Sequence, residues 1–231
     1  MGSNFLFVDT ETSGIPQSLN APVSDLGNWP YILQIAWLVY DRAGNLQKEE
    51  NHYIYEEDIL IQESSTRIHG ITREELIAKG EDRKSVLKLF ASDLRKYDPV
   101  VIGHFVEFDS KMIQVALMRA GQKNNVKKYR HFCTMRATSD YAIFHTSDYP
   151  KLEELHLKLF HEKMVRIHDA AVDVAATARC FFELKKRGEI SDEALSNQQI
   201  IFKMKDKVKE RTGCGLPVLV FITIGIALLL L

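Results

Sequence analysis

Four acidic residues and one histidine, in three separate stretches of this 231-residue chain, have the types and spacing of a metal site. Asp9 and Glu11 end an apolar run (Phe-Leu-Phe-Val), Asp109 lies in Glu-Phe-Asp-Ser, and His168 and Asp173 lie in His-Asp-Ala-Ala-Val-Asp. Residues two apart in a strand point to the same face, so we expect Asp9 and Glu11 to share one pocket. Oxygen ligands suit Mg²⁺ or Mn²⁺, and two such ions about 4 Å apart can bind the attacking and leaving oxygens of a phosphoryl displacement.

Each of these residues also has an ordinary structural explanation. An Asp-x-Glu after a strand is usually a solvated strand end. Asp109 and Asp173 come early in predicted helices, where they could be caps or first-turn acids. A spacing of five residues turns about 140° around a helix, so His168 and Asp173 would not share a helical face. We therefore expect His168 in the loop before the helix, over a site whose floor includes Asp173.

The three motifs come in a fixed order and are joined by further characteristic phrases. The motifs are Val-Asp-Thr-Glu-Thr-Ser-Gly from residue 8, Gly-His-Phe-Val-Glu-Phe-Asp from residue 103 and His-x4-Asp from residue 168; the phrases are Tyr-Ile-Leu-Gln-Ile-Ala, Ile-His-Gly-Ile-Thr and Leu-Glu-Glu-Leu-His. From about residue 4 to residue 188 the chain resembles the DEDDh exonucleases, the family of the proofreading subunit of bacterial DNA polymerase III, ribonuclease T and oligoribonuclease. Three motifs in order with these connecting phrases are far more specific than any one of them.

This resemblance implies an α/β, ribonuclease H-like fold and a two-metal 3′-to-5′ exonuclease that uses two Mg²⁺ or Mn²⁺ ions and releases nucleoside 5′-monophosphates. Asp9 would bridge both ions, Glu11 and Asp173 would complete the shell of the first, and Asp109 would hold the second through water. His168 would act as the general base that takes a proton from the attacking water, a role that suits an imidazole with an unperturbed pKa near 6.5.

Substrate contacts are expected at Thr10, whose backbone would meet the terminal 3′-hydroxyl, at Thr12 and, as a weaker candidate, at His69. The family usually has His-Asn where this chain has His104-Phe105. We interpret this change as tuning of the substrate groove and predict that Phe105 contacts the substrate. Other aromatic residues inside apolar runs are more often core than base-stacking platforms, namely Trp29, Trp37, Phe108 and Phe144.

Composition agrees with one catalytic domain. Hydrophobic residues make up 45% of the chain and charged residues 26%, enough for one substantial core and a small appendage. The cysteines are odd in number and have no metal-ligand spacing, which fits reduced thiols in a cytosolic setting; they are Cys133, Cys180 and Cys214.

The charge balance limits how nucleic acid could bind. A formal net charge of −1 gives no general attraction to nucleic acid, so affinity has to come from local basic patches and bound metal ions. The best candidate patch is the segment 123–131, for which a solvated loop is the alternative. Its basic residues are Lys123, Lys127, Lys128 and Arg130.

Hydrophobic periodicity and turn signals predict a mixed central sheet flanked by helices. Strands are expected at residues 5–11, 32–40, 52–55, 100–104 and 131–134, with a turn at 41–45. Helices are expected from the capping-box sequence at 72–75 and at residues 84–96, 109–120, 135–144, 151–160 and 170–187.

The segment 216–231 is uncharged and apolar, and no part of a nuclease fold needs it. As a helix it would span about 24 Å, somewhat less than the roughly 30 Å hydrocarbon core of a bilayer. A basic flank precedes it and would keep the nuclease on the cytoplasmic side, with Lys203, Lys205, Lys207, Lys209 and Arg211. We expect a membrane anchor; docking on the protein's own surface or on a partner is the alternative.

The domain prediction is an exonuclease domain at 1–190, a polar, basic linker helix at 191–215 and a C-terminal hydrophobic helix at 216–231. Residues 1–4 have no basic region and lead directly into the first predicted strand, so we expect neither a secretory signal nor a myristoylation motif. We expect an exonuclease, most simply one that acts on the 3′ ends of single-stranded DNA, with a DNA polymerase as a further possible partner. The alternatives are an RNA-trimming exoribonuclease, because the acidic residues serve either sugar equally, and a non-catalytic, membrane-tethered nucleic-acid-binding or polymerase-associated module.

Overall fold

A six-stranded mixed sheet forms the centre of the molecule in this computed structural model, which describes residues 4–57, 59–142 and 149–198. The strand order is β4-β3-β2-β1-β5-β6. β1 pairs antiparallel with β2 and parallel with β5, and β6 continues the parallel half. The strands are β1 (Asn4–Thr12), β2 (Ile32–Asp41), β3 (Leu46–Tyr55), β4 (Glu81–Asp82), β5 (Val100–Gly103) and β6 (Arg130–Cys133).

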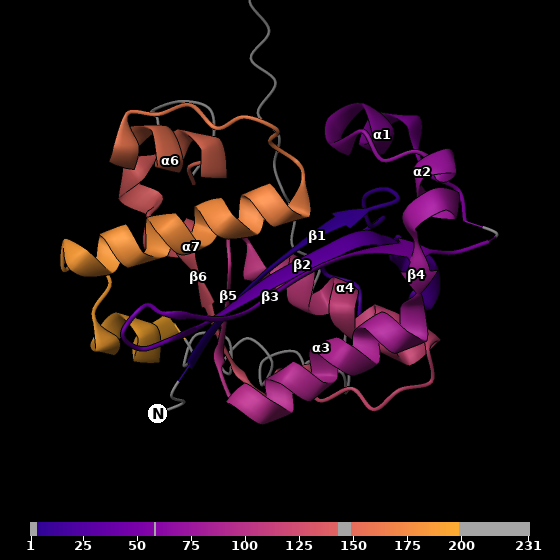
Figure 1. The fold of residues 1–231 in the computed structure, drawn as a ribbon, viewed down its shortest axis with the longest axis horizontal. Coiled ribbons are helices and arrows are strands. Elements are labelled where there is room, and N and C mark those ends of the chain that lie inside the picture. The colour runs from indigo at the N-terminus through magenta and orange to yellow at the C-terminus, as the bar shows by residue number, and fades with distance from the viewer. Residues whose placement is uncertain (1–3, 58, 143–148, 199–231) are drawn as a thin grey trace, which may run out of the picture.

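Helices cover both faces of this sheet (Figure 1), which confirms the predicted fold class for the described residues. α6 (Leu152–Phe160) and α7 (Ala170–Lys186) lie on one face, and α3 (Arg83–Tyr97) and α4 (Val106–Arg119) lie on the other. The shorter helices are α1 (Glu63–His69), α2 (Arg73–Lys79) and α5 (Thr134–Ala137), with 3-10 turns η1 (Leu26–Asn28), η2 (Val126–Lys128) and η3 (Ser139–Tyr141).

Side chains of β1 alternate between the two cores. Phe5 and Phe7 belong to the core under α7, where both rings lie edge-to-face against Phe181 at centroid distances of 5.0 and 5.3 Å. Leu6 and Val8 belong to the core under α3 and α4. Burying each of these side chains contributes about 1.5–3 kcal/mol, so the register of β1 is strongly fixed.

Local capping signals explain where several helices begin. Thr72 accepts a hydrogen bond from the backbone N–H of Glu75 at 3.2 Å, which is one of the two bonds of the predicted capping box. Asp169 caps α7 by accepting from the N–H of Ala171 at 3.1 Å. α4 starts three residues before the predicted position 109, because Phe105 turns the chain directly into the helix.

Other boundaries also differ from the predictions. The strand expected at residues 52–55 begins earlier, at Leu46, and pairs with β2 along most of its length. Its first half was not predicted because it is polar (Gln-Lys-Glu-Glu-Asn). The helix expected at 135–144 is replaced over its described part by the short α5 and by η3. α1 was not predicted because its sequence, Glu-Ser-Ser-Thr-Arg-Ile-His, has little apolar character and so no hydrophobic periodicity. Of its residues, only Ser65 is buried. Trp29 and Trp37 are 3% and 0% exposed, which confirms them as core residues, and Phe144 lies outside the described residues.

A side chain occupies the outer edge of β6 at Cys133. The Gln198 amide donates to the carbonyl oxygen of Cys133 at 3.0 Å and accepts from the backbone N–H of Cys133 at 2.8 Å. It thereby makes the two hydrogen bonds that a neighbouring strand would make. Ile190 and Leu195 anchor the same segment in the core under α7.

The predicted C-terminal hydrophobic helix at 216–231, its basic flank and most of the predicted linker lie outside the described residues. Within residues 4–57, 59–142 and 149–198, no helix combines the length and the apolar character needed to cross a bilayer.

Candidate active site

The predicted site residues meet at one edge of the sheet. Phe7 of β1 pairs with Ile102 of the parallel strand β5, so Asp9 and His104 each lie two residues beyond this pair. α4 and α7 both begin at this edge, after β5 and after the loop that ends at Asp169. The carboxyl ends of parallel strands are where ligands bind in sheets of this kind.

A cavity of about 570 Å³ opens at this edge. All five residues predicted to carry the chemistry line it, which are Asp9, Glu11, Asp109, His168 and Asp173. Thr10 and Phe105 line it as well. The remaining lining residues are His104, Phe108, Lys151, Leu152, Glu153, Met164 and Ile167.

The alternation of β1 explains how its two acids reach the cavity together. Asp9 and Glu11 continue the row of Phe5 and Phe7, on the face that α7 covers. Asp173 lies in the first turn of that helix. The strand-end interpretation of Asp9 and Glu11 does not apply, because Asp9 is half-buried and Glu11 is 9% exposed.

Three groups have the separation of a metal-ligand set. One ligand atom from each of Glu11, His168 and Asp173 lies within 4.8 Å of the other two. The backbone N–H of His168 donates to Asp173 Oδ2 at 3.0 Å, whereas Asp173 Oδ1 is buried and has no hydrogen-bond partner within the described structure. A buried carboxylate oxygen without a partner is costly, and a cation would satisfy it.

Burial raises the pKa of every carboxyl group in the set, and repulsion by the other members raises the pKa of Asp9 and Glu11 further. For Glu11, burial together with the charges of Asp173 and Asp109 raises the pKa to about 8. Burial raises the pKa of Asp109 to about 7 and that of Asp173 to about 6. The pKa of Asp9 is raised well above its ordinary range, first by burial and then by the neighbouring carboxylates. Carboxylates that repel one another in this way form a site that divalent cations stabilise.

Thr10 lies on the opposite face of β1 and fixes Asp109. Its hydroxyl donates to Asp109 Oδ1 at 2.7 Å, and Asp109 is 4% exposed. This bond lowers the pKa of Asp109 and so opposes the effect of burial. Asp109 lies in the first turn of α4 and Asp173 in the first turn of α7, where the positive ends of the helix dipoles favour negative charge.

His168 is exposed and lies in the loop before α7, as predicted. Its backbone has φ of 64° and that of Arg166 has φ of 56°, both in the left-handed region. The end of this loop is held by Asp169, which pairs with Arg166 and accepts from the Gln34 amide at 3.1 Å. The side chain of His168 is therefore carried by a strained but anchored backbone.

Two predicted substrate residues lie elsewhere. The hydroxyl of Thr12 donates to the carbonyl oxygen of Gly14 at 2.8 Å. Thr12 does not line the cavity, and the pairing of β1 with β2 shifts register between Glu11 and Thr12. His69 lines a separate hollow of about 270 Å³, to which His168 and Glu75 also contribute. Its ring donates to the Thr12 carbonyl oxygen at 3.2 Å and accepts from the N–H of Ile71 at 3.0 Å, and burial lowers its pKa.

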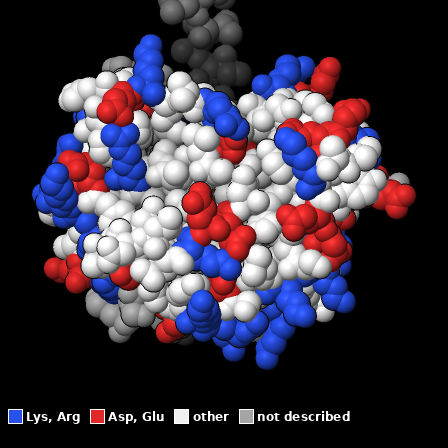
Figure 2. Space-filling view, in the orientation of Figure 1, with Lys and Arg blue, Asp and Glu red and all other residues white. Residues whose placement is uncertain are grey.

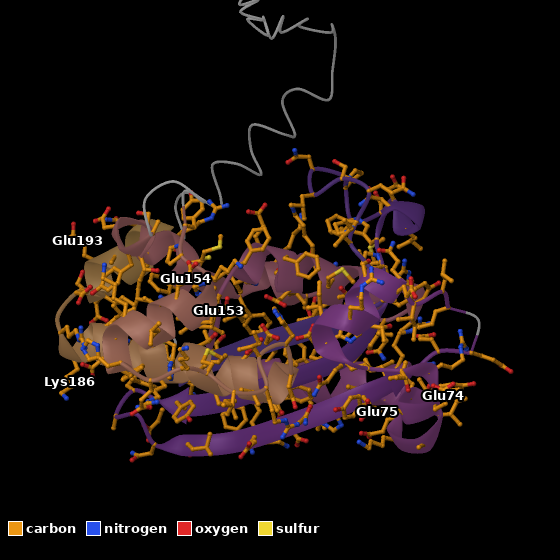
Figure 3. The ribbon with its side chains drawn as sticks, turned by 90° about the horizontal axis from the view of Figure 1, so that it is seen from above. Glu74, Glu75, Glu153, Glu154, Lys186 and Glu193 are labelled. Atoms are coloured by element: carbon orange, nitrogen blue, oxygen red, sulfur yellow. The ribbon has the colours of Figure 1, made fainter. Side chains whose placement is uncertain are left out.

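Lys151 and Glu153 line the cavity but were not singled out in the sequence. Lys151 is the N-cap of α6, directly before Leu-Glu-Glu-Leu-His, and Glu153 lies in its first turn. Neither was predicted, because both are far from the acidic motifs in the sequence. Figure 3 shows Glu153 and Glu154 on α6, on the opposite side of the molecule from Glu74 and Glu75 of α2. Among the residues that line the cavity, Lys151 is the one Lys or Arg.

The basic segment 123–131 does not adjoin this cavity. Arg130 begins β6 and pairs with Val100 at the start of β5, which is the end of the parallel strands opposite to the carboxylates. The exposed Lys127 and Lys128 precede it. Figure 2 shows many Lys and Arg side chains along this lower edge of the molecule, over α3. The segment therefore supplies no basic residue to the catalytic cavity.

Comparison with known proteins places this site in a family. The RNase_T exonuclease family model matches residues 6–181. No curated protein matches the sequence. Solved structures of E. coli exonuclease I have the same fold, including a complex with a dT13 oligonucleotide (24% identity, TM-score 0.66, 80% of this chain and 41% of that chain). A zinc-bound complex with single-stranded DNA matches at 22% identity with a TM-score of 0.68, over 91% of this chain and 45% of that chain.

The chain thus spans less than half the length of the exonuclease I chains that it resembles. The family match covers all three acidic motifs, and the matched residues converge on one cavity. The chain belongs to the exonuclease family, within the DEDDh group of metal-dependent 3′-to-5′ exonucleases.

Proposed function

We propose that this protein removes nucleotides one at a time from the 3′ ends of single-stranded DNA and releases nucleoside 5′-monophosphates. The observation that supports this most is the convergence of four carboxylates and His168, from three distant stretches, on one cavity. A surface that only bound nucleic acid would need none of these acids, because they repel the phosphate backbone unless cations are bound.

The residues fit two divalent cations. Asp173 offers a buried, unpartnered oxygen, Glu11 and His168 lie within reach of it, and Asp9 and Asp109 add two further carboxyl groups. The four carboxyl groups are hard oxygen donors, which Mg²⁺ and Mn²⁺ prefer. When bound, the ions would make water more acidic and stabilise the negative charge on the leaving oxygen.

We propose that His168 acts as the general base. Its side chain lines the cavity while remaining exposed, so it can take a proton from the attacking water and release it to solvent. The bond from its backbone N–H to Asp173 keeps its loop against the carboxylates. In this division of roles Asp9, Glu11, Asp109 and Asp173 bind cations and His168 moves the proton.

The substrate would enter between the carboxylates and the start of α6. Lys151 adds positive charge to an otherwise acidic cavity and is placed to neutralise a phosphate of the bound strand. The DNA preference rests on likeness, since the E. coli exonuclease I structures contain dT13 and dA16 oligonucleotides. Thr10, beside Asp9, is proposed to meet the terminal nucleotide.

One experiment tests this function directly. Full-length protein is incubated with 5′-labelled single-stranded DNA, duplex DNA and RNA of matched sequence, with Mg²⁺ and with EDTA. We expect single-stranded DNA to give a ladder of products shortened from the 3′ end in Mg²⁺, and no products in EDTA. Preferential shortening of RNA would assign the protein to RNA trimming, and binding without shortening in Mg²⁺ or Mn²⁺ would show a non-catalytic module.

A further inference from the structure

Phe105 has an unusual backbone conformation for its residue type. Its φ is 88° and its ψ is 38°, in the left-handed region where Gly is favoured and Asn, Asp and His are the commoner exceptions. The other non-glycine residues with positive φ in the described chain are all polar, namely Asp98, His161, Arg166 and His168. Within residues 4–57, 59–142 and 149–198, Phe105 is thus the one apolar residue other than glycine with a positive φ.

The same residue also fails to cap the helix that it begins. Phe105 is the N-cap of α4, and its side chain makes no capping hydrogen bond. An asparagine would adopt the left-handed backbone at lower cost than a phenylalanine does. Phenylalanine therefore costs local stability through its backbone and offers no side-chain acceptor to the first N–H groups of α4. Strained residues of this kind persist mainly where they serve function.

The ring of Phe105 is placed beside the chemistry. It lies nearly parallel to the ring of Phe108, with an interplanar angle of 12° and a centroid distance of 6.2 Å. Both residues are half-buried and both line the cavity, and Phe108 directly precedes Asp109 in the chain. Phe108 also packs against the core, so it supports the ring pair from the protein side.

Packing alone does not explain this arrangement. A core phenylalanine would be fully buried, as Phe5, Phe7 and Phe132 are at 0% exposure. The Phe105 ring instead lies at the wall of an open cavity. Flat rings at the wall of a nucleic-acid site offer a surface on which bases stack, and stacking tolerates any base because every base has a π face.

We propose that the Phe105–Phe108 pair is a platform on which a nucleobase at the 3′ end of the bound strand stacks, and that the strained backbone of Phe105 serves to present it. This inference deepens the proposed function, on which it rests for the identity of the substrate. It assigns affinity for the base to α4, while the carboxylates act only on the phosphate.

The test compares variants of the full-length protein on two substrates. Phe105→Asn removes the ring and relieves the backbone, Phe105→Leu removes the ring alone, and Phe105→Trp keeps an aromatic surface. Each is assayed on a dT10 oligonucleotide and on the same strand with abasic residues at its last two 3′ positions. Phe160→Leu serves as the control, since Phe160 is also half-buried but lies on α6 and does not line the cavity.

For Phe105→Asn we expect KM on dT10 to rise about tenfold, equivalent to about 1.4 kcal/mol, with kcat within about threefold of wild type. Its melting temperature should rise by about 2–4 °C, because the backbone strain is relieved. On the abasic strand the variant and wild type should have equal KM. Phe105→Leu should share the change in KM without the gain in stability, and Phe105→Trp should restore KM.

An unchanged KM for Phe105→Asn, or an equal rise on the abasic strand, would overturn the platform. Should a variant not fold, the wild-type protein still decides the matter through a 3′-terminal 2-aminopurine, whose fluorescence is quenched on stacking. Titration in Ca²⁺ without turnover should quench it, and unquenched binding would overturn the proposal. Because this titration needs no cleavage, failure of the platform and failure of the exonuclease assignment are distinguished.

Discussion

Thr10 Oγ1 donates a 2.7 Å hydrogen bond to Asp109 Oδ1, across a separation of 99 residues in the chain. The bond joins the sheet to α4 inside the cavity, and both residues are buried. It favours the charged form of a carboxyl group whose pKa burial raises to about 7. A strand hydroxyl therefore helps to keep a cation ligand ionised at neutral pH.

Replacement of Thr10 by Val should test this relationship. A hydrogen bond to a charged group contributes about 1.5–3 kcal/mol, so its loss should lower kcat/KM at pH 7 by about ten- to a hundredfold. Activity should partly recover at pH 9 and at high Mg²⁺ concentration, because Asp109 is then ionised again. Thr12→Val is the matched control, since the Thr12 hydroxyl bonds to Gly14 outside the cavity. Equal losses in both variants would contradict this account.

Asp9→Ala should abolish cleavage. We expect a loss of at least about a thousandfold in kcat, since each role of a bound cation supplies several kcal/mol and 1.4 kcal/mol is a factor of ten. Single-turnover assays with the purified variant measure this, with the exposed loop residue Asp25 changed to Asn as the control. Wild-type turnover by the Asp9 variant would refute the metal assignment.

His168→Ala should slow the chemical step by about a hundred- to ten-thousandfold and leave the affinity for Mn²⁺ nearly unchanged. The ligand-like separation of His168 from Glu11 and Asp173 makes calorimetry with Mn²⁺ the decisive measurement. A variant that no longer binds Mn²⁺ would make His168 a ligand. In that case another group would have to take the proton from water.

The raised pKa values predict that the metal-free protein loses stability as pH increases. Between about pH 4 and pH 8 the folded state keeps protons on Glu11, Asp109 and Asp173 that the unfolded state has released, so the free energy of unfolding falls over this range. Melting temperatures measured in EDTA from pH 5 to pH 8 should show the fall, and Glu11→Gln should reduce it. Mg²⁺ should stabilise the protein most at the upper end, because it binds the deprotonated groups.

The apolar segment 216–231 predicts that full-length protein sediments with membranes, whereas a chain ending at residue 215 stays in the supernatant with the same specific activity. Burying apolar side chains contributes about 25 cal/mol per Å², and salt does not screen this term. A wash in 1 M NaCl should therefore leave the full-length protein in the pellet. Recovery of full-length protein as a soluble monomer would contradict the anchor.

The sequence predicted the strand that carries Asp9 and Glu11 because a period of two and an apolar run are local signals. It also predicted the loop position of His168, from the angle that five residues make around a helix. The arrangement of these residues at one edge followed from the resemblance, since the pairing of β1 with β5 joins segments far apart in the chain.

Contacts without a local signal could not be predicted. Lys151 reaches the cavity through the packing of α6 against α7, and Thr12 misses it at the point where β1 shifts register against β2. The segment 123–131 was chosen as the candidate basic patch on charge alone, and the direction of β6 puts it at the end of the sheet opposite to the carboxylates. The left-handed backbone of Phe105, which sets the start of α4, has no signature in a phenylalanine.

Gln198 satisfies the backbone N–H and carbonyl groups of Cys133 at the edge of the sheet. An edge strand with free backbone groups invites a strand from another molecule, and such additions lead to swapped dimers and fibrils. By occupying both the N–H and the carbonyl oxygen of Cys133, a single amide denies that position to an incoming chain. Protection of β6 at Cys133 thus comes from a side chain 65 residues further along the chain.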